Sequence, residues 1–169
     1  MRINYESQIL SPQPDVMSNE LAELYQMWMD ARDGDIAPSW SVFSGIAIRM
    51  PALPKSVVVD VKNTPRDFVY RFWGTGRTRS QGNDLTGQSV SAIKPPETAK
   101  KITNEYNEVL NRGEPIWIPT KATYFGIDRV YDWLRLPLST DGQNIDMVFS
   151  TGIGDDSIEQ HYFEKLSEA

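Results

Sequence analysis

Hydrophobic side chains recur between residues 18 and 32 with the spacing of an α-helix. Leu21, Leu24, Tyr25 and Trp28 stand at i, i+3, i+4 and i+7, so they share one face. Ser18 or Asn19 can cap the N-terminus of this helix, and Asp33-Gly34-Asp35 ends it. We expect the apolar face to pack on the domain's own sheet or to form an interface with a partner helix.

Short runs of β-branched and aromatic residues predict five strands. The first two, 57–63 and 68–73, are separated by Asn63-Thr64-Pro65, which predicts a turn and hence an antiparallel hairpin. Three more strands are predicted over 115–125, 130–138 and 145–151.

Helices are predicted between the two groups of strands. The polar segment 77–93 contains two glycines and predicts short helical turns, whereas 97–112 predicts one long helix. Pro95-Pro96 precedes this helix and Gly113 ends it. This order predicts an α+β fold with one five-stranded antiparallel sheet. We expect the connecting helices to cover one face of the sheet and the N-terminal helix to cover the other.

The chain divides into three parts. Residues 1–17 contain Ser11-Pro12-Gln13-Pro14 and are expected to form an irregular arm. Residues 18–154 are expected to form a single domain, followed by a tail over 155–169. This tail holds the chain's one histidine, His161.

Both faces of the predicted sheet carry large apolar side chains. Alternation puts Tyr131, Trp133 and Arg135 opposite Leu134 and Leu136. A sheet face of this kind needs a cover, which is the N-terminal helix, a second subunit, or both. We therefore expect a homodimer. We also expect Trp117 and Trp133, on neighbouring strands, to share a face and to join the N-terminal helix in the interface.

Composition narrows the classes of function. The chain of 169 residues has 17 Lys and Arg against 23 Asp and Glu, a net charge of −6, so we expect no nucleic-acid partner. It has no cysteine, which excludes disulfides, thiolate metal sites and a cysteine nucleophile. The apolar runs are too short to span a membrane, and the N-terminus has no signal-peptide core, so we expect a cytoplasmic protein.

Four motifs in a fixed order resemble a bacterial subfamily of PAS domains. They are a helix with a tryptophan at Leu24 to Trp28, Tyr70-Arg71 with Gly74-Thr75, Gly82 to Gly87, and Leu136 to Gly142. The resemblance covers roughly residues 20–154. It implies a five-stranded antiparallel sheet in the order 2-1-5-4-3, a long helix before the third strand, and a sensory or regulatory role without catalysis.

A PAS-like fold implies a cavity between the sheet and its helices, largely apolar with a few polar groups. We expect it to bind a small molecule, and an unidentified signalling protein is a further expected partner. The residues expected to line the cavity are Tyr70, Arg71, Phe72, Trp73, Tyr106, Tyr124, Leu134, Leu136 and Met147.

Arg71 is the strongest single candidate for a ligand-binding residue, because it is a cation flanked by aromatic residues on a strand expected near the centre of the fold. A buried guanidinium needs a partner, so Arg71 either binds a ligand anion or pairs with Asp132, Glu105 or backbone carbonyls. Strand alternation also allows it to face solvent.

The resemblance also disfavours the commonest cofactors of PAS domains. Haem sensors of this fold use a histidine on the long helix, where residues 97–112 have none, and its flavin photosensors and thioester chromophores use a cysteine, which the chain lacks. A non-covalently bound flavin, a small organic acid and an empty, tightly packed core stay open. The cofactor therefore stays unknown. Two alternatives remain, a ketosteroid-isomerase-like enzyme that uses Asp132 with Tyr106 or Tyr124, and a ligand-free dimerisation module.

Overall fold

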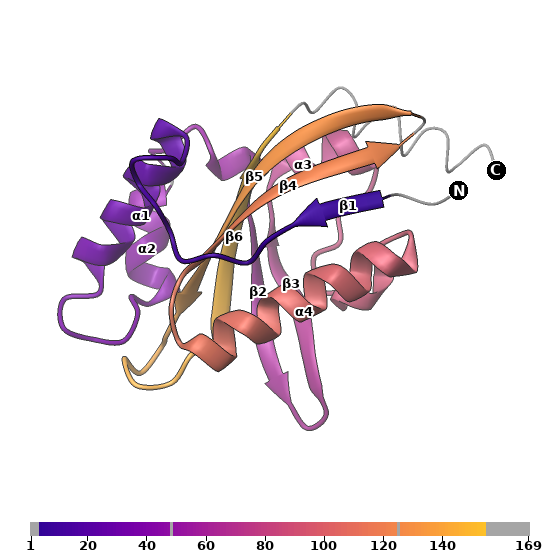
Figure 1. Ribbon diagram of the computed structural model, residues 1–169. Coiled ribbons are helices and arrows are strands. Elements are labelled where there is room, and N and C mark those ends of the chain that lie inside the picture. Colours follow the sequence, from indigo (N-terminus) through magenta and orange to yellow (C-terminus); the bar gives the residue numbers. More distant parts are fainter. Residues whose placement is uncertain (1–3, 48, 125, 155–169) are drawn as a thin grey trace.

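One antiparallel sheet of six strands forms the centre of the molecule (Figure 1). The computed structural model describes residues 4–47, 49–124 and 126–154, without the side chains of 79–81 and 124. The strands lie in the order β1-β4-β5-β6-β2-β3. Their bounds are β1 Asn4–Ser7, β2 Val57–Asn63, β3 Arg66–Trp73, β4 Ile116–Tyr124, β5 Ile127–Leu138 and β6 Met147–Ile153.

The hairpin of β2 and β3 contains a β-bulge. Val59 pairs with Tyr70, whereas Val58 pairs with Phe72, so Arg71 is an extra residue on β3. Strict alternation would put Tyr70 and Trp73, three residues apart, on opposite faces. The bulge instead brings both side chains to the same face of the sheet, where their rings meet edge to face at 4.8 Å.

Helices α1 (Asn19–Ala31) and α2 (Trp40–Ala47) cover one face of the sheet (Figure 1). The Ser18 hydroxyl accepts a hydrogen bond from the Leu21 backbone and caps α1. Leu21, Leu24 and Trp28 are fully buried, and the Trp28 indole donates to the Pro137 carbonyl at 2.7 Å. The amphipathic face of α1 is therefore used inside the chain.

Helix α4 (Pro96–Arg112) covers the other face, together with the 3₁₀ turn η2 (Val90–Ala92). Gly113 follows α4 in the left-handed conformation, which glycine adopts without strain. Helix α3 (Thr75–Gln81) and the 3₁₀ turn η1 (Leu53–Lys55) complete the fold. They meet closely at Gly74, where a Cβ would lie 2.2 Å from the Pro54 carbonyl oxygen.

The predicted α+β architecture is confirmed, including the five strands and the helices on both faces. The arm over residues 1–17 differs from expectation, because residues 4–7 form β1 and pair with β4 at the edge of the sheet. Leu10 then makes two backbone hydrogen bonds with Trp117. The expected tail over 155–169, with His161, lies outside the described residues.

Candidate functional site

Three charged side chains form a chain of ion pairs between α4 and the sheet. Glu105 of α4 accepts from Arg135 of β5 at 2.6 and 3.0 Å, both through Oε2. Its other oxygen, Oε1, pairs with the ammonium of Lys101 one turn earlier. Glu105 and Arg135 are each 3% exposed, whereas the Lys101 side chain is 20% exposed. This row of ion pairs, Lys101–Glu105–Arg135, therefore runs from the core at Arg135 to the surface at Lys101.

Aromatic rings surround the inner end of this row. The Arg135 guanidinium lies 4.6 Å from the ring centre of Tyr106 and 5.6 Å from that of Trp133, within the range of cation–π attraction. Tyr106 in turn packs on Phe68 at 5.1 Å. Trp133 fits against β6 because its partner there is Gly152, where a Cβ would lie 2.6 Å from the indole.

The surroundings set the protonation states of two groups. Burial raises the pKa of Glu105, but the charges and hydrogen bonds of Arg135 and Lys101 lower it by more, so its pKa lies below the ordinary range. Burial and the neighbouring Tyr106 raise the pKa of Tyr70 well above its ordinary value, against the smaller effects of Arg135 and Arg77. Glu105 is therefore a carboxylate and Tyr70 a neutral phenol at neutral pH.

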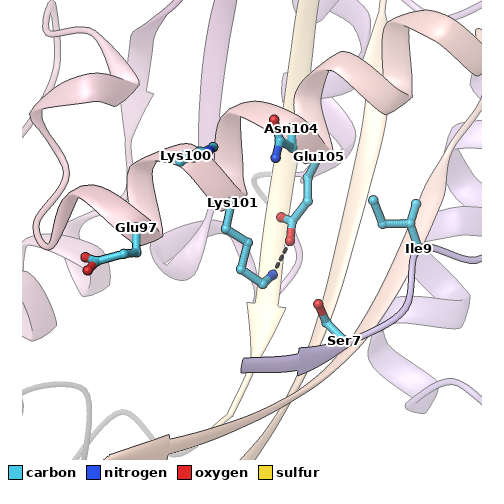
Figure 2. A pocket seen from close by; sticks show the side chains of 7 residues that line it. All are labelled: Ser7, Ile9, Glu97, Lys100, Lys101, Asn104 and Glu105. Carbon is cyan, nitrogen blue, oxygen red and sulfur yellow. Dashed lines mark hydrogen bonds and ion pairs between the residues drawn. The ribbon is translucent and has the colours of Figure 1, made fainter. Parts of the chain in front are cut away.

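A groove opens between β1 and α4 at the outer end of the row. Its volume is about 390 Å³, within the roughly 300–1,000 Å³ typical of small-molecule sites. The side chains of Lys101 and Glu105 extend from α4 toward Ser7 on β1 (Figure 2). The lining residues are Ser7, Ile9, Glu97, Lys100, Lys101, Asn104 and Glu105.

No protein-family model and no curated protein matches the sequence. Among solved structures, the chain is similar to a light-oxygen-voltage domain studied with a flavin analogue, at 17% identity and a TM-score of 0.47, over 76% of this chain and 94% of that one. It is also similar to the PAS domain of Bordetella pertussis BvgS, at 14% identity and a TM-score of 0.43, over 76% and 96% of the two chains.

A third solved structure is an RNA-binding light-oxygen-voltage receptor, at 9% identity and a TM-score of 0.49, over 98% of this chain. The chain spans only 43% of that receptor's length.

The order of the strands decides the fold. Counted from β2 along the chain, the five main strands lie in the order 2-1-5-4-3, with the long helix α4 before the third. The chain has a PAS-like fold.

The structure divides the predicted pocket residues of this PAS-like domain between two cores. Tyr70, Trp73 and Tyr106 lie in the core between the sheet and α4. Phe72, Leu134, Leu136 and Met147 lie on the opposite face, in or against the core beneath α1 and α2. The side chain of Tyr124 lies outside the described residues. These residues therefore do not line one common cavity.

Arg71 lies at the surface of the PAS-like domain, with its side chain 48% exposed and its Nε 2.7 Å from Asp60. The buried cation is Arg135 instead, which is not among the predicted site residues. One sequence signal could have found the pair, because Glu105 stands on the apolar face of the long helix beside Tyr106. A carboxylate at such a position needs a buried partner.

The predicted interface residues lie within the chain's own packing. Leu21, Leu24 and Trp28 are buried beneath α1, and Tyr25 is partly buried beside them. Trp117 and Trp133 lie on opposite faces, contrary to expectation, since Trp117 pairs with Leu134 whereas Trp133 pairs with Ile118. The apolar face that suggested a second subunit is thus covered from within.

In residues 4–47, 49–124 and 126–154, no three histidine or acidic side chains gather as a metal ion would need. In the same part of the chain, no helix has the length and apolar character to cross a membrane.

Proposed function

We propose that this PAS-like domain is a non-catalytic sensory or regulatory domain that binds a small molecule in the groove between β1 and α4. The observation that carries the proposal is the row Lys101–Glu105–Arg135. It connects the lining of the groove to β5 in the centre of the sheet.

The groove is a better candidate site than the interior beside it. Phe68, Tyr70, Trp73 and Tyr106 fill the space between the sheet and α4, and each is at most 6% exposed. A ligand placed there would have to displace closely packed rings, which costs the energy of their contacts. The groove offers volume, charge and hydrogen-bonding groups without such a rearrangement.

A ligand in the groove would act on the sheet through charge. Anything that binds Lys101 changes the field at Glu105, which Arg135 balances from β5. Ion pairs of this depth are sensitive to the loss of either partner. The groove is therefore suited to a response in which ligand contact on α4 changes the strength with which α4 is held to β5.

An isomerase-like function finds no support in the geometry. That chemistry needs a carboxylate base facing a tyrosine donor. Asp132 accepts from Ser18 and from the Trp117 indole on the α1 face, whereas Tyr106 lies on the α4 face. Tyr124 pairs with Ile127, five positions along β4 from the partner of Asp132, which is roughly 17 Å of strand.

The proposal includes no haem held by a helix histidine and no cysteine-linked flavin or chromophore, because α4 has no histidine and the chain no cysteine. It also does not require a homodimer, since α1 covers its own sheet.

The test is a thermal-shift screen of the purified protein against a metabolite library, with native mass spectrometry to detect a co-purified compound and to count subunits. We expect at least one compound to raise the melting temperature, because binding to the folded state alone stabilises it. A protein that carries no bound mass and melts unchanged with every compound would contradict ligand binding. If it were also dimeric, it would favour the dimerisation module.

A further inference from the structure

The row of ion pairs carries an unbalanced positive charge. Lys101 and Arg135 contribute two cations and Glu105 one anion, so the sum is +1. Two of the three groups are buried and Lys101 is partly so. A net positive charge on buried or partly buried groups is poorly solvated, so it attracts an anion more strongly than an exposed lysine does.

The other charges of the groove do not cancel this excess. Lys100 adds a cation and Glu97 an anion. Within the part of the chain that the structure describes, neither of them forms an ion pair, although Glu97 stands one turn before Lys101. The groove is thus a positive site on a chain whose net charge is −6.

Lys101 is held in position before any ligand arrives. Its ammonium lies 5.4 Å from the ring centre of Tyr5 on β1, and the Tyr5 hydroxyl lies 3.0 Å from Thr98 Oγ1 on α4. An ammonium has three N–H donors, of which Glu105 accepts one. Preorganised donors of this kind lower the entropic cost of binding an anion.

We propose that the groove binds a small organic monocarboxylate, with its carboxylate on Lys101 and its apolar part against Ile9. This ligand class rests on the proposed function, that the groove binds a small molecule. One negative charge matches the excess of +1. A phosphate dianion fits less well, because Glu97 and Glu105 also line the groove.

Glu105 keeps its place when the ligand binds. Its Oε2 accepts two hydrogen bonds from Arg135, which hold the carboxylate in position. Lys101 therefore contacts the ligand and Glu105 at the same time. Ser7 and Asn104, which also line the groove, supply further hydrogen-bonding groups.

The experiment compares matched pairs of ligands by isothermal titration calorimetry of the full chain. Acetate, isovalerate and benzoate are each titrated beside the amide of the same shape, and inorganic phosphate is titrated separately. The carboxylates should bind at least about tenfold more tightly than the amides, because a hydrogen bond to a charged group contributes that much. Phosphate should bind more weakly than benzoate.

Variants then locate the site. Lys101→Met keeps most of the apolar stem and should weaken benzoate binding about tenfold or more, whereas Lys121→Met, on β4 beside Asp128, should leave it unchanged. Glu97→Gln removes a repelling charge and should strengthen benzoate binding about two- to fivefold. Melting curves of Lys101→Met show whether it is folded, and the wild-type comparison of acids with amides stands without it.

The outcomes separate the two proposals. Equal binding of acids and amides, tighter binding of phosphate, benzoate binding that Lys101→Met leaves unchanged, or no binding of any carboxylate would each overturn the monocarboxylate assignment. If an uncharged compound from the library still raises the melting temperature, the proposed function stands. If nothing in the library does so, the proposed function itself fails.

Discussion

Glu105 and Arg135 are the two residues on which the polar interior depends. Both are buried, and their charges neutralise each other across the boundary between helix and sheet. Removal of one partner of a buried pair leaves the other uncompensated, which costs roughly 3–5 kcal/mol. The pair thus fixes how α4 lies on β5, whatever the groove binds.

Glu105→Gln should lower the free energy of unfolding by roughly 3–5 kcal/mol at neutral pH. The pKa of Glu105 is lower in the folded chain than its ordinary value of about 4.3. Its stabilising effect is therefore fully present above that ordinary pKa and is lost as the pH falls through the folded-state pKa. The difference between wild type and variant should shrink below about pH 4.

Urea unfolding of both proteins between neutral and acidic pH measures this difference. Glu108→Gln is the matched control on the same helix, because its pair with Arg112 is exposed and contributes little. A difference that stays constant down to acidic pH would count against the carboxylate as the stabilising group.

The sequence predicted individual site residues less well than it predicted the helices and strands that carry them. Alternation along a strand indicates which residues share a face but not which cation meets a helix carboxylate, so the sequence points to Arg71, whereas the buried cation is Arg135. The bulge at Arg71 is set by the pairing of two strands, and nothing in the local sequence marks it.

The elements with a strong hydrophobic period were predicted well, because burial on one face and the period of the backbone coincide. Helices α1 and α4 begin and end within about a residue of the expected bounds, since caps, prolines and glycines mark their ends. Strand β1 was missed. Its residues Asn4 to Ser7 are mostly exposed, and the strand depends on hydrogen bonds to β4 rather than on apolar burial.

Helix α1 should stabilise the domain mainly through Trp28. Trp28→Ala should cost roughly 3–5 kcal/mol, since it leaves a large cavity against the sheet. Trp28→Phe should cost roughly 1–3 kcal/mol, because the ring is kept but the Pro137 carbonyl loses its donor.

Chemical denaturation of the two variants tests the order of these effects. Glu23→Ala, on the exposed side of the same helix, should stay within about 0.5 kcal/mol of wild type. Equal stability of Trp28→Ala and wild type would mean that α1 does not close this face of the sheet in solution.

The whole molecule is a sheet with a separate core on each face. Large apolar side chains fill both cores, and the core beneath α4 also encloses the ion pair of Glu105 and Arg135. Strand β1 extends the sheet at the edge beside α4 (Figure 1). The groove is lined by residues of α4 and of the segment 7–9 that includes the end of β1. We therefore expect a ligand in the groove to affect α4 and the residues packed against it, and to leave the core beneath α1 and α2 unchanged.

The most direct test is an NMR titration of the isotopically labelled protein with sodium benzoate. Amide signals of α4 from Glu97 to Glu105 and of residues 7–9 should shift, together with the indole signal of Trp133 beside Arg135. The indole signals of Trp28 and Trp40 on the α1 face should stay in place. Shifts centred on α1 and α2 would contradict a ligand site between β1 and α4, and no shifts at all would contradict its assignment to a monocarboxylate.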